Sequence, residues 1–285
     1  MGITANELRK EMALIEFQSV NKQFDDGTVA VNNFTFTFPS HQVTVLVGSS
    51  GCGKTTILRM VNRMIEPSTG SILIDDQDIK SRDVVDLRRS IGYVLQAGGL
   101  LPHRTIEDNI ATVPILNGIP KRQARNAALE LLDKVGLDRA LARRYPHQLS
   151  GGQQQRVGVA RALASNPNIL LMDEPFGAVD PIVRTELQIE LNRLQRELAK
   201  TIVFVTHDID EAFALADQIV ILRKGGVIAQ VGTPQEILAD PADEFVASFI
   251  GADKSRRQLH RSSQANGTTL LVDGSGRPSG YLAEE

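Results

Sequence analysis

The eight residues from Gly48 to Thr55, GSSGCGKT, constrain the fold of this chain more than any other segment, because they fit the phosphate-binding pattern G-x-x-x-x-G-K-[ST]. The apolar run Val43–Val47 before them predicts a buried strand, and Thr56–Met60 after them predicts the start of a helix. A strand that leads through a glycine-rich turn into a helix points backbone N–H groups and the positive end of the helix dipole at one anion. A chance match in a Gly/Ser loop would lack these flanking elements.

We therefore expect the whole loop to bind phosphate groups. The residues expected to do so are Gly48, Ser49, Ser50, Gly51, Cys52, Gly53, Lys54, Thr55 and Thr56. Lys54 adds a full positive charge for the outer phosphates, and the Thr55 hydroxyl is a candidate ligand for magnesium. Cys52 is the single cysteine, so it forms no internal disulfide, which suits a reducing compartment, and we interpret it as a small filler of the loop.

The composition is that of a globular protein with no electrostatic preference for nucleic acid. Of the 285 residues, 42% are hydrophobic and 23% are charged, and the net charge is −3. A basic face for nucleic acid is therefore not expected. No apolar run approaches the roughly 18 residues that a membrane span needs, and the N-terminus lacks the hydrophobic stretch of a signal peptide. We expect any role at a membrane to come through partners.

The predicted elements alternate between strand and helix around the loop, which indicates an α/β fold with a mostly parallel, helix-covered sheet. One helix is expected from Lys121 to a stop at Gly136, and another begins with Asp180 as its N-cap and Pro181 as its first residue. Strands are expected at residues 14–20, 34–38, 71–74, 169–172 and 202–205.

A second glycine-rich helix start is formed by Ser150, Gly151, Gly152 and Gln153. In isolation it would be a turn with a capping serine, but as the start of a helix it can also face an anion. The strand at 169–172 then ends on two carboxylates, Asp173 and Glu174, and such strand ends reach the edge of the sheet where ligands bind. Asp173 is placed to support magnesium, and Glu174 to polarise a water against a γ-phosphate.

Together these residues resemble the ATP-binding subunits of ABC transporters. The phosphate loop, the signature Leu149–Gln153, the Asp173-Glu174 pair and His207 occur in that family's order and approximate spacing, over about residues 14 to 250. The resemblance implies a P-loop NTPase of ABC type, with a RecA-like core sheet, an antiparallel β subdomain and an inserted α-helical subdomain of about residues 97–163. It implies a nucleotide-binding domain of residues 1–253, followed by a tail.

The resemblance assigns further roles by position. Gln96 matches the glutamine that contacts magnesium and senses the membrane partner, Asp180 the aspartate that communicates across a dimer, and His207 the histidine that contacts the γ-phosphate. Phe24 corresponds to the aromatic residue that stacks on adenine, which is usually a tyrosine. Without the family, Gln96 would be a surface residue, Asp180 an N-cap, His207 a structural residue and Phe24 a core aromatic.

The same resemblance implies the ligands and partners of the chain. ATP and Mg2+ would join two ATP-binding subunits head to tail, each signature closing over the other's nucleotide; we expect a second copy of this chain, with a related subunit as the alternative. Transmembrane permease subunits would be gripped through residues 98–103 and 105–110, and an extracytoplasmic substrate-binding protein would act indirectly. The chain would then lie peripherally at the cytoplasmic face of the cell membrane.

Three classes of function differ in the residues that they require. The energising ATPase of an importer fits best, with Glu174, His207 and Gln96 as catalytic residues. A non-transport ABC ATPase of the translation or DNA-maintenance kind normally needs two nucleotide domains, a long coiled coil or a basic face, whereas this sequence has one phosphate loop and no basic excess. A purely regulatory binding module would not need Glu174.

Within importers, the similarity is to the ATP-binding subunits for quaternary ammonium osmoprotectants such as glycine betaine, carnitine and choline. Three stretches carry it: Ile91–Gln96 with Leu101–His103, Leu149–Ala160, and Phe245–Gly251. An importer of amino acids or of another small polar solute is the alternative.

The tail at residues 254–285 is polar, with Thr269–Leu282 resembling one hairpin of a cystathionine-β-synthase-type regulatory domain and Asp273–Pro278 as its turn. Many related subunits continue into a pair of such domains. A lone hairpin is marginally stable in water, so we expect a docked or disordered tail.

Overall fold

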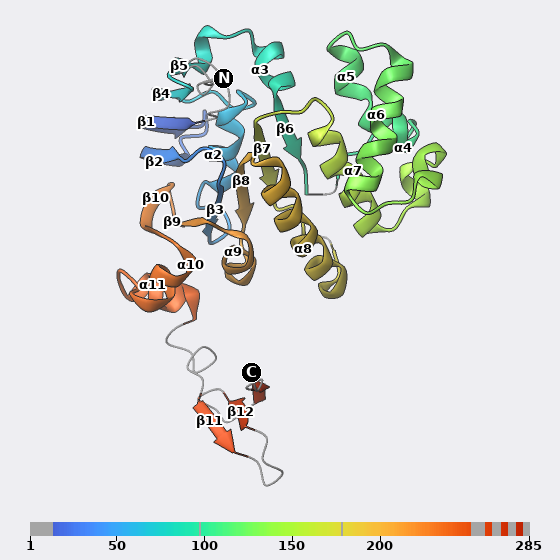
Figure 1. The fold of residues 1–285 in the computed structure, drawn as a ribbon. Helices are drawn as coiled ribbons and strands as arrows, with labels where there is room; N and C mark the ends of the chain where they lie inside the picture. The colour runs from blue at the N-terminus through green and yellow to red at the C-terminus, as the bar shows by residue number, and fades with distance from the viewer. Residues whose placement is uncertain are drawn as a thin grey trace, which may run out of the picture.

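The computed structural model describes residues 14–96, 98–177, 179–251, 260–263, 269–272 and 278–281. In this part of the chain the strands form three sheets (Figure 1), one mostly parallel and two antiparallel. None of its helices combines the length and the apolar character that crossing a membrane requires.

The central sheet has the strand order β10-β9-β3-β8-β7-β6. Its strands are β3 (Val43–Gly48), β6 (Ile91–Val94), β7 (Ile169–Asp173), β8 (Thr201–Thr206), β9 (Gln218–Arg223) and β10 (Val227–Gly232). All neighbouring pairs are parallel except β9 with β10. The strands β3, β7 and β8 are buried along their whole length, as expected for parallel strands that are covered on both faces.

The antiparallel sheet has the order β2-β1-β4-β5. Its strands are β1 (Ile15–Gln23), β2 (Val29–Phe38), β4 (Thr69–Ile74) and β5 (Gln77–Asp78). On β2 the inward side chains alternate with exposed ones, and Phe34 and Phe38 pack edge-on against Phe17 of β1. This alternation is the pattern of a sheet with one face in the core.

In the central sheet, helices separate β3, β6, β7, β8 and β9 along the chain. They are α2 (Lys54–Val61), α3 (Val84–Ser90), α4 (Ile106–Ile110), α5 (Thr112–Leu116), α6 (Lys121–Lys134), α7 (Gly151–Leu163), α8 (Pro181–Leu198), α9 (Ile209–Leu215), α10 (Pro234–Ala239) and α11 (Glu244–Ile250). Short 3-10 helices lie at Ile79–Ser81, Arg139–Arg143 and Pro146–Gln148. Figure 1 shows α4 to α7 gathered beyond β6, on the side of the central sheet opposite the antiparallel sheet.

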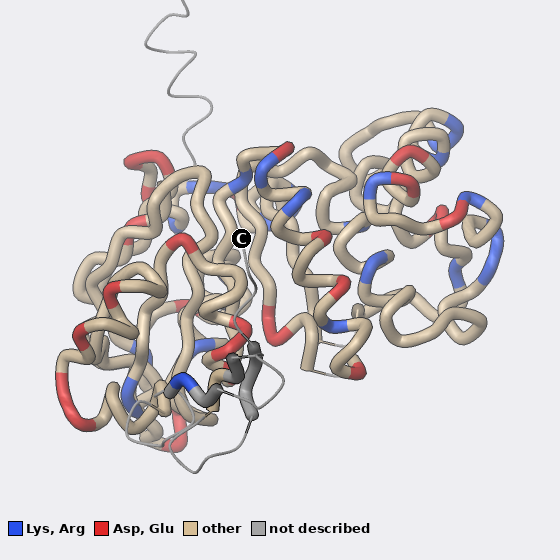
Figure 2. The backbone as a smooth tube through the Cα atoms, turned by 60° about the horizontal axis from the view of Figure 1, so that its bottom comes forward, with Lys and Arg blue, Asp and Glu red and all other residues tan. Residues whose placement is uncertain are grey.

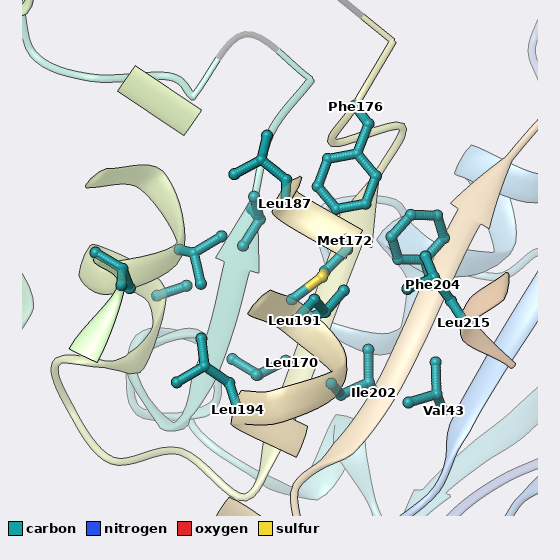
Figure 3. Packing of buried hydrophobic residues seen from close by; sticks show 14 of the residues in the cluster. Val43, Leu170, Met172, Phe176, Leu187, Leu191, Leu194, Ile202, Phe204 and Leu215 are labelled. Carbon is teal, nitrogen blue, oxygen red and sulfur yellow. The ribbon is translucent and has the colours of Figure 1, made fainter. Parts of the chain in front are cut away.

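The core beneath the carboxyl ends of the strands is built by α8 packing on the central sheet. Leu187, Leu191 and Leu194 form one apolar stripe of α8 and are at most 5% exposed. Figure 3 shows these side chains beside Leu170 and Met172 of β7, which belong to the same buried cluster. The stripe follows the 3.6-residue period of an amphipathic helix, and it fixes α8 over the strand that carries the two carboxylates.

The structure agrees with most of the predicted elements and shifts some of their ends. The helix expected at 56–60 already begins at Lys54, and the strand expected at 34–38 begins at Val29. The helix that begins at Lys121 ends before Gly136, which has a left-handed φ of +68° and so acts as the expected stop. The antiparallel edge formed by β9 and β10 was not predicted.

The tail contains the expected hairpin and one further strand. β12 (Thr269–Val272) pairs with β13 (Pro278–Tyr281), and β11 (His260–Ser263), which was not predicted, pairs with β12. Residues 273–277 of the expected turn and residues 254–259 lie outside the described residues. Figure 1 places this small sheet beyond α11 and apart from the two larger sheets.

Charged residues of both signs are interspersed over the surface. Figure 2 shows positions of Lys and Arg and of Asp and Glu scattered along the backbone, in the helices beyond β6 as well as around the two larger sheets.

Candidate functional site

The predicted site residues meet at one edge of the central sheet. Because β3, β8, β7 and β6 run parallel, their carboxyl ends lie side by side, with Val47 paired to Thr206, Val205 to Asp173 and Met172 to Val94. The phosphate loop, His207, Glu174 and Gln96 each follow one of these strand ends. An open parallel sheet binds its ligands at this edge.

The phosphate loop joins β3 to α2 and leaves the start of α2 open for an anion. The N-cap of α2 is Gly53, which has no side chain and therefore makes no cap hydrogen bond to the first turn. Its φ is +111°, and a Cβ at this position would lie 2.4 Å from the Ala30 carbonyl oxygen. Only glycine fits this backbone and this approach, so the first-turn N–H groups face outward without a competing side chain.

Lys54 lies inside the loop rather than in solvent. It is 5% exposed, and its ammonium donates hydrogen bonds to the carbonyl oxygens of Gly48 at 2.7 Å and Ser49 at 3.1 Å. These contacts hold a full positive charge next to the free N–H groups of α2. Cys52 is 1% exposed and fills the loop interior, as its interpretation as a filler predicted.

Thr55 and Asp173 form the link between α2 and β7. The Thr55 hydroxyl donates to Asp173 Oδ1 at 2.8 Å, while Asp173 Oδ2 accepts from Arg59 Nη2 and from the Tyr93 hydroxyl, both at 3.2 Å. Burial, reinforced by the Asp173 charge, raises the pKa of Tyr93 to about 12. Tyr93 therefore stays protonated at neutral pH and donates to the carboxylate.

The donors at this position fit a magnesium ion. A threonine hydroxyl and a carboxylate are the hard oxygen ligands that Mg2+ prefers, and the ion usually completes its shell with water and substrate phosphates. Among the described residues, no group of three or more His, Cys, Asp or Glu side chains could hold a metal by itself. Thr55 and Asp173 therefore suit an ion that is shared with a phosphate ligand.

Glu174 is held in a constrained backbone conformation and faces His207. It has a φ of +44°, which is uncommon for a residue other than glycine, and its N–H donates to the Val205 carbonyl oxygen at 3.0 Å. Glu174 Oε2 lies 3.2 Å from His207 Nδ1. The end of β7 thus aims one carboxylate at the histidine that follows β8.

Gln96 lies near the segment that follows Glu174. It is exposed, and its side-chain Nε2 lies 3.1 Å from the point that a Cβ of Gly177 would occupy. Gln96 therefore approaches the turn after β7 beside Gly177, where an added Cβ would push the end of the Gln96 side chain aside.

The second helix start, at α7, lies away from the phosphate loop of the same chain. Ser150 caps α7 by accepting from the Gln153 N–H at 3.3 Å, and Gln153 Oε1 accepts from the Ser150 N–H at 3.0 Å. Ser150 and Gly151 are exposed. α7 packs against β6, α4, α6 and α8, whereas α2 packs against β2, β3, β7 and β8 (Figure 1).

Asp180 and Phe24 are also placed at the surface. Asp180 is the N-cap of α8, accepting from Ile182 N at 3.2 Å and Val183 N at 3.1 Å, so the predicted cap is confirmed. Phe24 is 38% exposed in the turn after β1, with Lys22 Nζ 5.1 Å from its ring centroid. Its exposure excludes the core role.

Two residues of this site, Arg59 and Tyr93, were not predicted. Arg59 follows Thr55 by four residues, so the helical period alone places both on one face of α2 and could have indicated the contact with Asp173. The Tyr93 contact depends on the pairing of β6 with β7, in which Tyr93 lies opposite Leu171. That register is a tertiary feature without a local sequence signal.

Comparison with known proteins gives close relatives over most of the chain. The model of the ABC transporter family matches residues 31–177. The choline transport ATP-binding protein OpuBA of Bacillus subtilis is 54% identical over 241 residues, which are 85% of this chain and 63% of that protein. The glycine betaine/carnitine/choline transport ATP-binding protein OpuCA of the same organism is 52% identical over 262 residues, 91% of this chain and 69% of that protein.

A solved structure also resembles the chain. The dimeric post-hydrolysis structure of the ATP-binding cassette MJ0796, bound to ADP and Pi, has a TM-score of 0.70 and 33% identity and covers 77% of this chain and 98% of its own. This chain therefore spans a whole cassette of that kind, but less than two thirds of the length of OpuBA.

Proposed function

This chain belongs to the ABC transporter family, and from that membership we propose that it is the ATP-hydrolysing subunit of an importer for quaternary ammonium osmoprotectants. The observation that carries the ATPase proposal is the meeting of the phosphate loop, Asp173, Glu174 and His207 at the carboxyl edge of the central sheet. The solute class is supported by the names of OpuBA and OpuCA, which are transport ATP-binding proteins for choline and for glycine betaine, carnitine and choline.

ATP binding begins with the triphosphate in the loop. The uncapped N–H groups of α2 and the Lys54 ammonium donate hydrogen bonds to the phosphate oxygens. The exposed ring of Phe24 stacks on adenine. Thr55 and Asp173, with Gln96 as a further proposed ligand, would hold magnesium, which would supply positive charge to the phosphate oxygens. Tyr93 and Arg59 occupy Asp173 Oδ2, which orients Oδ1 toward Thr55.

Hydrolysis uses the residues that follow β7 and β8. Glu174 polarises the attacking water, and its left-handed backbone conformation directs the carboxylate out of the strand toward His207. His207 contacts the γ-phosphate and senses its loss. Phosphoryl transfer depends mainly on how the reacting groups are positioned and on how their charge is stabilised. The fold therefore contributes to hydrolysis mainly by fixing the backbone at the ends of β7 and β8.

Two subunits complete the site. The Ser150 helix start is exposed and lies away from the phosphate loop of its own chain, so it serves the nucleotide of a partner. We infer a head-to-tail dimer of two copies of this chain that ATP closes and hydrolysis releases. The γ-phosphate contacts differ between the open and closed states, and this difference couples the chemistry to motion.

The remaining partners follow from the same function. Transmembrane permease subunits dock on the helical subdomain around Gly98–His103 and α4, and a substrate-binding protein delivers solute on the outer side. The Asn109 side chain is fully buried there and forms hydrogen bonds with the backbone of Leu101 and Arg104. These bonds fix the conformation of the loop before α4, on which the permease is proposed to dock. The chain acts at the cytoplasmic face of the membrane, and residues 1–253 form its nucleotide-binding domain.

The test combines hydrolysis with uptake. Purified wild-type chain should release phosphate from ATP, and Lys54→Ala should lose ATP binding because the loop loses its charge. Deleting the gene in its own organism should abolish uptake of choline, carnitine or glycine betaine, and the wild-type gene, but not the Lys54→Ala gene, should restore it. Unchanged uptake of all three solutes in the deletion strain would contradict the proposed solute class, and absent ATP turnover would contradict the ATPase.

A further inference from the structure

Arg184, on the first turns of α8, joins three segments that end at the candidate catalytic site. Its Nη2 donates to the Val179 carbonyl oxygen at 3.4 Å, its Nη1 lies 3.4 Å from Asp208 Oδ2, and its Nε lies 3.6 Å from Glu211 Oε1. Val179 precedes the Asp180 cap, Asp208 follows His207, and Glu211 belongs to α9.

The turn that carries His207 is fixed on both of its sides. The Thr206 hydroxyl donates to Glu211 Oε2 at 2.6 Å and accepts from the Asp208 N–H at 3.0 Å, which closes the backbone around His207. Asp208 Oδ1 accepts from the Asp210 N–H and caps α9. The His207 ring is exposed, but the residues on either side of it, Thr206 and Asp208, are held by hydrogen bonds.

The network lies next to the reacting groups, with Glu211 as its buried end and the Arg184 and Asp208 side chains partly exposed. The Glu211 side chain is 6% exposed, and burial raises its pKa, opposed by the Thr206 hydrogen bond and the Arg184 charge. A small pocket lined by Glu174, His207, Arg184 and Glu211 connects this ion pair to the catalytic pair. Arg184 Nε is itself buried and makes no hydrogen bond, so its 3.6 Å approach to Glu211 is an ion pair alone.

We propose that Arg184 is a positioning residue that fixes His207 against Glu174 by tying the turn after β8 to the segment that enters α8. The proposal rests on the proposed ATPase function. The contacts of the Arg184 side chain are with Val179, Asp208 and Glu211. Arg184 therefore affects turnover by setting the position of His207. Its planar fork reaches Val179, Asp208 and Glu211 together, which a lysine ammonium cannot do.

The test compares Arg184→Lys with Arg193→Lys in the purified full chain. Arg193 lies on the same helix and pairs at the surface with Glu190 and Glu197, so its substitution controls for the loss of a guanidinium on α8. We expect Arg184→Lys to lower kcat about tenfold, with KM for ATP and the melting temperature close to wild type, because a misplaced catalytic group loses rate rather than binding. Arg193→Lys should keep the wild-type kcat.

A second variant, Asp208→Asn, removes only one contact of Arg184. Asparagine retains the side-chain oxygen that caps α9 but loses the charge that faces Arg184. We expect kcat to fall by a few fold at unchanged KM. If Arg184→Lys does not fold, a wild-type kcat for Asp208→Asn overturns the proposal.

The outcomes separate this proposal from the function on which it rests. Wild-type protein without ATP turnover contradicts the proposed function. Wild-type turnover with equal kcat for Arg184→Lys and Arg193→Lys contradicts the positioning role alone. An Arg184→Lys protein whose KM rises or whose melting temperature falls together with its kcat also overturns it, since the residue would then be a general structural support.

Discussion

The Thr55 hydroxyl donates a 2.8 Å hydrogen bond to Asp173 Oδ1, which joins the first turn of α2 to the end of β7. The two residues are far apart in the sequence, yet both lie at the carboxyl edge of the central sheet, where a shared magnesium ion would sit between them and a phosphate. Since Arg59 and Tyr93 hold the other carboxylate oxygen, the orientation of Asp173 is set before any ligand binds.

Removing the Thr55 hydroxyl should therefore weaken nucleotide binding only when magnesium is present. We expect Thr55→Val to reduce ATP affinity by about tenfold, the scale of one lost ligand contact, in buffer with Mg2+, and to leave affinity with EDTA unchanged. Titration calorimetry under both conditions measures the difference. Thr185→Val is the matched control, because the Thr185 hydroxyl donates to the Pro181 carbonyl oxygen within α8. An equal loss of affinity with and without magnesium would contradict the assigned role of Thr55.

Replacing the Glu174 carboxylate should separate binding from turnover. Glu174→Gln keeps the size of the side chain and removes its charge, so we expect near-wild-type ATP affinity, at least about a 100-fold loss of phosphate release, and a dimer that persists with ATP. Gel filtration with ATP and a phosphate-release assay measure the two effects. Glu186→Gln on the exposed face of α8 should hydrolyse ATP normally. Hydrolysis by Glu174→Gln near the wild-type rate would refute the assignment.

Local sequence patterns predicted those candidate site residues that lie directly after a strand recognisable in the sequence. The loop Gly48–Thr55 and the Asp173-Glu174 pair follow buried strands, and parallel pairing then brings them to one edge of the sheet. The Tyr93 contact and the Arg184 network could not be predicted in this way. Each depends on how elements that are distant in the sequence pack together, and an arginine in a helix has no sequence feature that reveals which carboxylate it meets.

The signature should act on the partner's nucleotide. In the Glu174→Gln background, Ser150→Arg should bind ATP as a monomer but fail to dimerise, because a bulky cation at the start of α7 blocks the approach of the partner's γ-phosphate. The substitution also removes the hydroxyl that accepts from the Gln153 N–H, which costs about 1 kcal/mol of stability. Ser150→Ala loses the same cap without the bulk and should still dimerise, although more weakly.

Mixing experiments test whether this action occurs between chains. In a mixture of Ser150→Arg with a chain that carries Glu174→Gln alone, one complete site forms between the phosphate loop of the first chain and the intact signature of the second. The other site contains the altered signature, so we expect fewer mixed dimers than Glu174→Gln forms with itself. ATP-driven dimerisation of Ser150→Arg at the level of Ser150→Ala would exclude the signature from the interface.

The tail should contribute little to folding or to basal hydrolysis. Its described strands are four residues each, and Leu271 and Val272 are only half-buried, so they offset a small part of the roughly 1 to 2 kcal/mol per residue that ordering a backbone costs. We expect a chain that ends at Asp253 to melt within about 3 °C of the full chain and to hydrolyse ATP at its rate. A chain that ends at Asp240 is the control, because it also loses Val246 and Ile250, which are at most 1% exposed in the main core cluster, and it should melt at a clearly lower temperature. If the Asp253 variant melts as early as the Asp240 variant, or loses most of its basal ATPase, the small sheet is a docked structural part of the protein.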